Sequence, residues 1–217
     1  MTFDIRSRRL RGGLVGALLA ARVVCAEPGG PDAAALLRKA EASPAAPDAA
    51  VCLRTAIRCA RGPEAVRIQD RAFELLVANH PASPQLVEVL RRLEWGEPVH
   101  ARQSIARAVG APISDAARAT AELALARIAM RALYCGSAPA AAENAEIAHH
   151  LASALDLFRT VRDQPAIQRV ERAQFELAHL MPGCPAPEIE GKDLEGRPMK
   201  LSDFRGKVVL ISFWGDW

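Results

Sequence analysis

The chain has 217 residues, of which 50% are hydrophobic and 24% are charged, and its formal net charge is +3. This composition excludes a wholly disordered chain, and the length allows about one and a half domains of ~150 residues. Five arginines precede Glu27, so residues 27–217 are almost neutral, which argues against nucleic acid or an anionic membrane surface as the main partner.

Residues 1–26 have the three parts of an export signal. A basic stretch from Arg6 to Arg11 precedes a short apolar run, and Val24 to Ala26 places small residues where a signal peptidase cleaves. The apolar run is shorter than the ~20 residues that span a bilayer. We expect an exported bacterial protein, periplasmic or otherwise extracytoplasmic, with no membrane span beyond the leader. The alternative is a cytoplasmic protein with a basic N-terminus.

Residues 27–48 are rich in alanine, proline and glycine, which predicts a linker with one short helix around Ala33 to Ala42. From about residue 49 to residue 180 the composition shifts to alanine, leucine, arginine and glutamate, which are strong helix formers. We therefore expect a mainly α domain over 49–180.

Capping residues divide the region from 49 to 180 into separate helices. Ser83 and Ser114 are each placed to cap a helix, and Pro84 suits the first helical position after Ser83. Gly62-Pro63 interrupts the pattern earlier in the chain. These signals place one helix after Gly62-Pro63 that runs to Asn79, one that begins at Pro84, and one that Ser114 caps and that runs to Cys135.

Two apolar stripes at helical spacing follow, one from Ile147 to Val161 and one that begins after Pro165 and ends at Leu180. The whole region then holds about six or seven helices with short connections, which favours packing as antiparallel hairpins. An irregular tetratricopeptide-like array is an alternative arrangement of these helices, although no period of ~34 residues is maintained.

The cysteines outside the leader are Cys52, Cys59, Cys135 and Cys184, and no two of them have the spacing of a redox or zinc motif. Cys52 and Cys59 would lie ~10.5 Å apart along one helix, which is too far for a direct disulfide. Cys52, Cys59 and Cys135 are therefore interpreted as small buried apolar residues. A disulfide with a cysteine on another helix stays open, because export leads to an oxidising compartment.

The histidines do not follow a metal-binding pattern. His149 and His150 are adjacent, so their side chains point ~100° apart on a helix. No helix carries two histidines at ligand spacing together with a carboxylate, and no glycine-rich phosphate loop is present. We expect surface or half-buried histidines, with no metal and no cofactor.

The character of the sequence changes after Met181. Lysines and β-branched residues become frequent, and Glu195-Gly196 predicts the turn of a hairpin. A strand is expected from Lys207 to Trp214, because Val208 to Ile211 is apolar without alternation. Such runs are typical of a strand buried on both faces of an α/β sheet.

The stretch from Gly183 to Trp217 resembles the start of the redoxin family. This family comprises the alkyl hydroperoxide reductase/thiol-specific antioxidant proteins and the periplasmic or membrane-tethered thioredoxin-like proteins. Three elements match in order and spacing, over about one sixth of the chain. They are the entry Pro185-Ala186-Pro187, the hairpin Gly196-Arg197-Pro198 followed by Leu201-Ser202-Asp203, and the strand Arg205-Gly206-Lys207-Val208-Val209 that leads to Phe213-Trp214 and Trp217.

The resemblance implies a thioredoxin-like fold and thiol chemistry on a disulfide or peroxide substrate. In this family the position after Trp217 is the nucleophilic cysteine of a Cys-x-x-Cys motif at a helix N-terminus, where the helix dipole lowers the pKa of the thiol. Phe213, Trp214 and Trp217 then flank the active site as packing residues. Cys184 matches no catalytic position.

The 217 residues stop one position before that motif, so we expect a truncated, inactive fragment with no catalytic residue of its own. The alternative is a non-enzymatic helical interaction or scaffold protein with a redoxin remnant, whose helical domain binds a protein partner. Without covering helices, the last segment is expected to be poorly ordered or to dock on the helical domain. The expected domains are a signal peptide (1–26), an Ala/Pro-rich linker (27–48), a helical domain (49–180), a linker (181–187) and a truncated thioredoxin-like domain (188–217).

Overall fold

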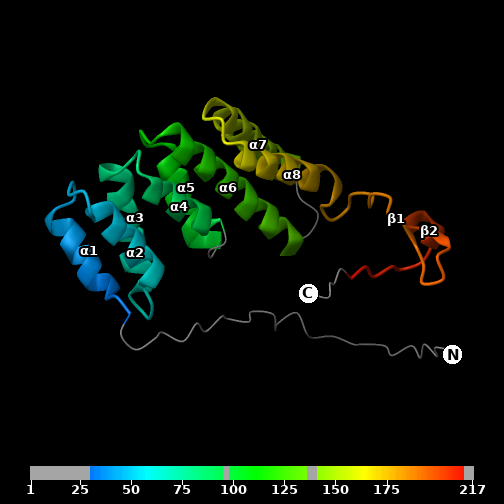
Figure 1. The fold of residues 1–217 in the computed structure, drawn as a ribbon, viewed down its shortest axis with the longest axis horizontal. Helices are drawn as coiled ribbons and strands as arrows, with labels where there is room; N and C mark the ends of the chain where they lie inside the picture. Colours follow the sequence, from blue (N-terminus) through cyan, green and yellow to red (C-terminus); the bar gives the residue numbers. More distant parts are fainter. Residues whose placement is uncertain (1–29, 95–97, 136–140, 213–217) are drawn as a thin grey trace. The chain divides into compact units, whose positions relative to one another are not determined.

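The structure is a computed structural model that describes residues 30–94, 98–135 and 141–212. The predicted export signal over 1–26 and the aromatic residues from Phe213 onward lie outside these ranges. The described chain is mainly helical, as the composition predicts (Figure 1).

Eight α-helices and one small sheet lie within the described ranges, and most helices that follow one another in the chain pack side by side. This arrangement is the one that short connections favour. The helices are α1 (Ala33–Ala42), α2 (Ala49–Cys59), α3 (Ala65–Asn79), α4 (Pro84–Leu93), α5 (Pro98–Val109), α6 (Asp115–Cys135), α7 (Ala141–Thr160) and α8 (Gln164–His179), followed by the strands β1 (Glu190–Lys192) and β2 (Pro198–Lys200) and the 3-10 helix η1 (Leu201–Phe204).

Helix α6 lies between two apolar cores. Its residues Ala117 and Ala121 belong to a first core that is shared with α1 to α5. Ala119 and Leu123 belong to a second core that is shared with α7 and α8. Because a step of two residues turns ~200° around an α-helix, these two sets lie on opposite faces. Helix α6 is therefore buried on two faces, and its small alanines allow its neighbours to approach closely.

The predicted helix starts at Ser83 and Ser114 are confirmed. The Ser83 hydroxyl accepts a hydrogen bond from the amide of Leu86 at 3.2 Å, and the Ser114 hydroxyl accepts one from the amide of Ala117 at 3.3 Å. Each bond satisfies a backbone donor that the first helical turn leaves unpaired. Local capping chemistry is therefore sufficient to start α4 and α6 at these places.

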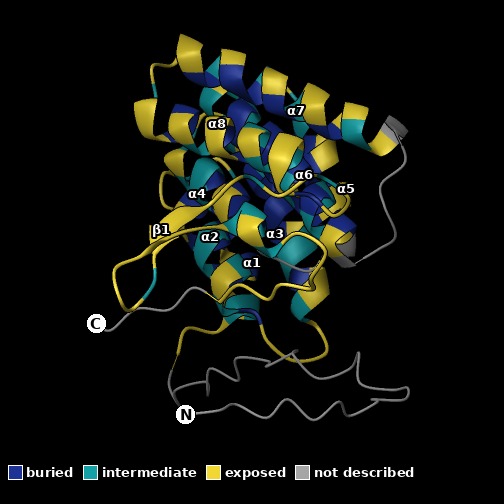
Figure 2. Ribbon diagram, turned by 90° about the vertical axis from the view of Figure 1, so that its right-hand side faces the viewer, coloured by how far each residue is buried: buried dark blue, intermediate teal, exposed yellow. Residues whose placement is uncertain are grey.

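The short helix predicted around Ala33 to Ala42 is confirmed as α1, and its Leu37 and Ala40 are buried in the first core. It gains apolar burial against α2 and α3, so this part of segment 27–48 packs with the other helices. One predicted stripe needs correction. Val161, predicted as the end of a buried stripe, follows the last residue of α7 and is exposed. Figure 2 shows the buried inner faces of the helices and the exposed outer faces of α7 and α8.

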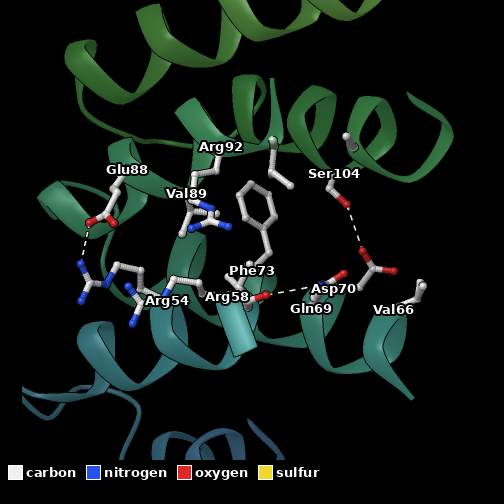
Figure 3. A pocket seen from close by; sticks show the side chains of 13 residues that line it. Arg54, Arg58, Val66, Gln69, Asp70, Phe73, Glu88, Val89, Arg92 and Ser104 are labelled. Atoms are coloured by element: carbon white, nitrogen blue, oxygen red, sulfur yellow. Dashed lines mark hydrogen bonds and ion pairs between the residues drawn. The ribbon is translucent and has the colours of Figure 1, made fainter. Parts of the chain in front are cut away.

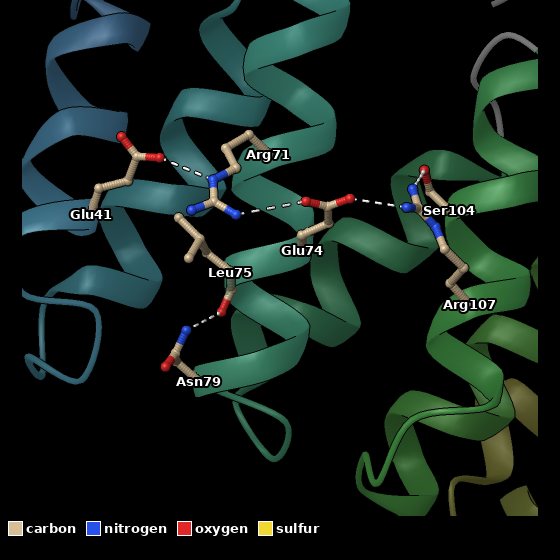
Figure 4. A network of polar contacts seen from close by, with 7 residues as sticks. All are labelled: Glu41, Arg71, Glu74, Leu75, Asn79, Ser104 and Arg107. Atoms are coloured by element: carbon tan, nitrogen blue, oxygen red, sulfur yellow. Dashed lines mark hydrogen bonds and ion pairs between the residues drawn. The ribbon is translucent and has the colours of Figure 1, made fainter.

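A chain of polar contacts crosses the outer surface of α1, α3 and α5 (Figure 4). Arg71 on α3 contacts Glu41 on α1 at 3.0 Å, and Glu74 on α3 contacts Arg107 on α5 at 2.9 Å. All four side chains keep more than a third of their surface exposed. Exposed ion pairs contribute ~0–1 kcal/mol each, so this chain of contacts adds little to stability.

The C-terminal part contains a hairpin but not the predicted α/β sheet. Strands β1 and β2 are antiparallel, with Gly191 opposite Met199. The strand predicted from Lys207 to Trp214 is not formed over 207–212, and the side chains of Val208 and Leu210 are fully exposed or nearly so. A strand forms only beside a neighbour to which it is hydrogen-bonded. In the described part of the chain the sheet consists of β1 and β2, and residues 207–212 do not pair with it.

Candidate functional site

The residues predicted to flank a redox site, Phe213, Trp214 and Trp217, all lie outside the described residues. The described part of the same segment is the stretch from Met181 to residue 212. Two carboxylates in this stretch, Glu188 and Asp193, each hold a turn by accepting hydrogen bonds from backbone amides.

Glu188 ties the entry of the segment to the helix η1. Its Oε1 accepts hydrogen bonds from the amides of Ser202 at 3.0 Å and Ile189 at 3.2 Å. The amide of Leu201 also donates to the carbonyl of Ile189 at 2.9 Å. The hydrogen bonds from Ser202 hold the pKa of the Glu188 carboxyl below its usual range. The predicted short turn around Ser202 is therefore confirmed, and it is anchored on Glu188, two residues before β1.

Asp193 organises the loop of the hairpin. Its Oδ1 accepts from the amides of Arg197 at 2.8 Å and Glu195 at 3.0 Å, and the guanidinium of Arg197 donates to its other oxygen at 2.8 Å. The backbone hydrogen bond from Arg197 lowers the pKa of Asp193 most. Gly196 has φ of 81°, a conformation that side chains disfavour. The predicted turn at Glu195-Gly196 is confirmed.

The cysteines do not form a redox pair among the described residues. Cys52 is buried in α2, as predicted, while Cys59 at the end of α2 and Cys184 are half-buried, and all three are free thiols. Cys184 packs against the second core. Cys135 ends α6, and its side chain lies outside what the structure describes. Cys59 is the last residue of α2 and is half-buried, which differs from the predicted burial.

A metal-binding cluster and a membrane-spanning helix are both absent from residues 30–94, 98–135 and 141–212. No group of three metal-ligating side chains converges there. No helix in these ranges is both long enough and apolar enough to cross a bilayer.

Histidine His150 forms a polar pair with Glu122 between α7 and α6. Its Nδ1 lies 2.5 Å from Oε2 of Glu122, and its Nε2 lies 3.8 Å from Glu146. Arg102 on α5 also contacts Glu146, at 2.7 Å. The hydrogen bond to Glu122 raises the pKa of His150, against the lowering effect of burial. Sequence spacing could not reveal this pair, because its members are 28 residues apart.

We expect the free energy of unfolding to fall as pH rises above ~6.5, the ordinary pKa of histidine. The folded pKa of His150 lies above that value, so its charged form stabilises the fold at lower pH. This contribution is lost as pH rises through the folded pKa. Urea unfolding at several pH values should show a weaker pH dependence in His150→Gln. His149→Gln, at an exposed neighbouring position, is the control and should keep the wild-type slope.

A second polar cluster joins α4, α6 and α8. The Glu94 carboxylate, which is 6% exposed, lies 2.8 Å from Arg169 on α8 and 3.6 Å from Arg127 on α6. Arg127 also contacts Glu176 at 2.5 Å, and the Tyr134 hydroxyl donates to Glu176 at 2.8 Å. Partial burial and the hydrogen bond to Glu176 raise the pKa of Tyr134 to about 12.

Tyr134 offers a direct test of this cluster, because it is the one tyrosine in the sequence. We expect its ultraviolet absorbance to titrate near pH 12 in the folded chain and near ~10 when the chain is unfolded. Glu176→Gln removes the neighbouring negative charge and should move the folded titration toward the lower value. Glu171→Gln, at an exposed position of α8, should leave it unchanged. A folded titration near pH 10 would contradict the geometry.

The chain is similar to known proteins over a short stretch. No family model matches the chain, and no solved structure matches. Proteins described as "Thiol-disulfide oxidoreductase ResA" match over 35 residues, with 51% identity in Geobacillus thermodenitrificans, 49% in Bacillus thuringiensis subsp. konkukian and 49% in Geobacillus kaustophilus. The match covers 16% of this chain, and the chain spans 20% of the length of these relatives.

This similarity supports a relationship to the thioredoxin-like redoxins over a short part of the chain. The matched length of 35 residues equals the length of the segment 183–217, which carries the redoxin-like motifs in the sequence.

Proposed function

We propose that residues 183–217 begin a thioredoxin-like domain, and that the whole protein is an exported thiol-disulfide oxidoreductase with an N-terminal helical domain. The observation that carries the proposal is the 35-residue match at about half identity to thiol-disulfide oxidoreductases. The hairpin and its capped turn around Ser202 agree with the order of elements that the sequence motifs imply. The basic and apolar leader over 1–26 supports export.

The proposed chemistry is thiol–disulfide exchange. A cysteine thiolate attacks one sulfur of a substrate disulfide, forms a mixed disulfide and displaces the other sulfur as a thiolate. The second cysteine of the pair then attacks the mixed disulfide and releases the first substrate sulfur as a thiol. In total the enzyme dithiol is oxidised to a disulfide and the substrate disulfide is reduced to two thiols. In this proposal Phe213, Trp214 and Trp217 pack beside the reacting sulfurs.

The 217-residue chain is expected to give no catalysis of insulin reduction by dithiothreitol, because no two of its cysteines are separated by two residues as in Cys-x-x-Cys. A gene product that continues past codon 217 into Cys-x-x-Cys should accelerate the reaction, and serine at the first of those cysteines should abolish the effect. Hydrogen peroxide consumption, measured in parallel, separates disulfide reduction from peroxidase activity. Turnover by the 217-residue chain would contradict its expected inactivity.

The same experiment addresses the alternative, a helical interaction protein without enzymatic activity. An open reading frame that lacks a Cys-x-x-Cys motif after residue 217, together with no turnover, would favour it over the oxidoreductase.

A further inference from the structure

A pocket opens between α2, α3, α4 and α5, away from the redoxin-like segment in the sequence (Figure 3). Its volume is about 310 Å³, at the lower end of the range of ~300–1,000 Å³ typical of ligand pockets. This volume suits a large apolar side chain together with the backbone next to it.

The floor of the pocket is apolar. Phe73 and Val89, which are both buried in the first core, form its base, and Ile57 and Leu93 are half-buried at its sides. Val66 keeps 43% of its surface exposed. Covering such surface with an apolar group contributes ~25 cal/mol for each Å² removed from water. The floor therefore favours an apolar ligand group.

One edge of the pocket carries an excess of positive charge. Arg54 and Arg58 come from α2 and Arg92 from α4, and Figure 3 shows their side chains on the same side as Glu88. Glu88 pairs with Arg54 at 2.6 Å, but Arg58 and Arg92 have no ion-pair partner among the described residues. The buried Nε of Arg54 has no hydrogen-bond acceptor there either.

At the opposite edge the polar side chains form hydrogen bonds within the protein. Ser104 on α5 donates to the Asp70 carboxylate at 3.3 Å, and Gln69 donates to the carbonyl of Ile57 at 3.2 Å. Hydrogen-bond donors and positive charge therefore stay available to a ligand at the edge that carries the arginines. Guanidinium groups bind carboxylates through paired N–H donors.

We propose that this pocket binds a peptide segment of a partner protein that carries an apolar side chain next to acidic residues. The apolar side chain occupies the floor over Phe73 and Val89, and the carboxylates contact Arg58 and Arg92. Only a ligand that brings both features satisfies both halves of the pocket. The chain outside the leader is almost neutral, so the charge is local and does not favour nucleic acid, which offers phosphates without an apolar side chain.

The proposal does not depend on the oxidoreductase assignment, because all of its residues belong to the helical domain. The probe is a fluorescein-labelled peptide with the sequence Ser-Gly-Glu-Leu-Glu-Gly-Ser, added to the 217-residue chain and followed by fluorescence anisotropy. Saturable binding is expected with Kd on the order of 100 µM. The same peptide with glutamine for both glutamates, or serine for leucine, should bind about tenfold more weakly or not at all.

The double variant Arg58→Glu, Arg92→Glu should weaken binding of the acidic peptide by about tenfold or more, and should fold normally because both side chains are exposed. The matched control is Arg38→Glu, Arg159→Glu, which makes the same charge change at exposed positions away from the pocket. It should leave Kd within about twofold. Val66→Ser tests the apolar half and should also weaken binding.

Three results would overturn the proposal. One is equal binding of the acidic and glutamine peptides, and another is an absence of saturable binding. The third is a sedimentation experiment in which the wild-type chain is a dimer and Arg58→Glu, Arg92→Glu is a monomer, because a second copy of the chain would then occupy the pocket. The insulin assay tests the oxidoreductase proposal separately, so none of these three results bears on it.

Discussion

Leu123→Ala is expected to lower the free energy of unfolding by about 3–5 kcal/mol. Leu123 is 1% exposed, near the middle of α6 and within the second core. Its truncation removes buried methyl groups and leaves a cavity that the surrounding helices fill only in part. Since a small domain is stable by only ~5–15 kcal/mol, this change removes a large share of the total.

Because α6 belongs to both cores, the effect of Leu123→Ala should extend beyond the second core. Hydrogen exchange should speed up in α2, which contacts only the first core, as well as in α7. Urea unfolding followed by circular dichroism measures the loss of stability. The matched control is Leu194→Ala, the same substitution at a hairpin residue that is fully exposed; it should stay within ~0.5 kcal/mol. Unchanged exchange in α2 would show that the cores unfold separately.

Glu94→Gln is expected to lower the free energy of unfolding by about 2–4 kcal/mol. The substitution keeps the shape of the side chain but removes the charge that Arg169 and Arg127 share. Arg131 also donates to the backbone carbonyl of Glu94. Glu94 therefore joins α6 and α8 to the end of α4. Removing one partner of a buried ion pair leaves the other charge uncompensated; here that charge is Arg169, because Arg127 keeps its contact with Glu176. The two arginines keep about a third of their surface exposed, which places the expected loss below that of a fully buried pair.

The control for Glu94 is Glu88→Gln, which removes a similar Glu–Arg contact between two helices, with Arg54 at 2.6 Å. Glu88 is nearly half exposed, so water and salt screen the pair and the expected loss is at most ~1 kcal/mol. Both variants are compared by urea unfolding at low and high salt. Equal losses for the two variants would mean that burial of Glu94 does not set its contribution.

Features that depend on neighbours in the chain were predicted from the sequence. Ser83 and Ser114 cap helices because their hydroxyl groups reach amides three residues ahead. The loop at Glu195-Gly196 forms because glycine accepts the positive φ that the turn needs. The apolar stripe that starts at Ile147 marks the buried face of α7, because its residues recur at the helical period.

Features that depend on distant residues were missed or misplaced. The helix predicted around Ala33 to Ala42 is confirmed, but composition does not show that its Leu37 is covered by other helices. The strand expected from Lys207 requires a neighbouring strand that the described residues do not supply. Glu94 and Arg169 are 75 residues apart, so no spacing rule connects them.

The sequence by itself determined the helical class, the caps, the hairpin and the redoxin-like motifs, since each arises from contacts within a few residues or from residue order. Only the tertiary structure decided that α6 is buried on two opposite faces and that Arg58 and Arg92 border an apolar pocket. Burial and charge pairing are properties of surfaces that meet in space. The energies that hold this protein together, and the pocket proposed to bind a partner, therefore follow from packing between helices that lie far apart in the chain.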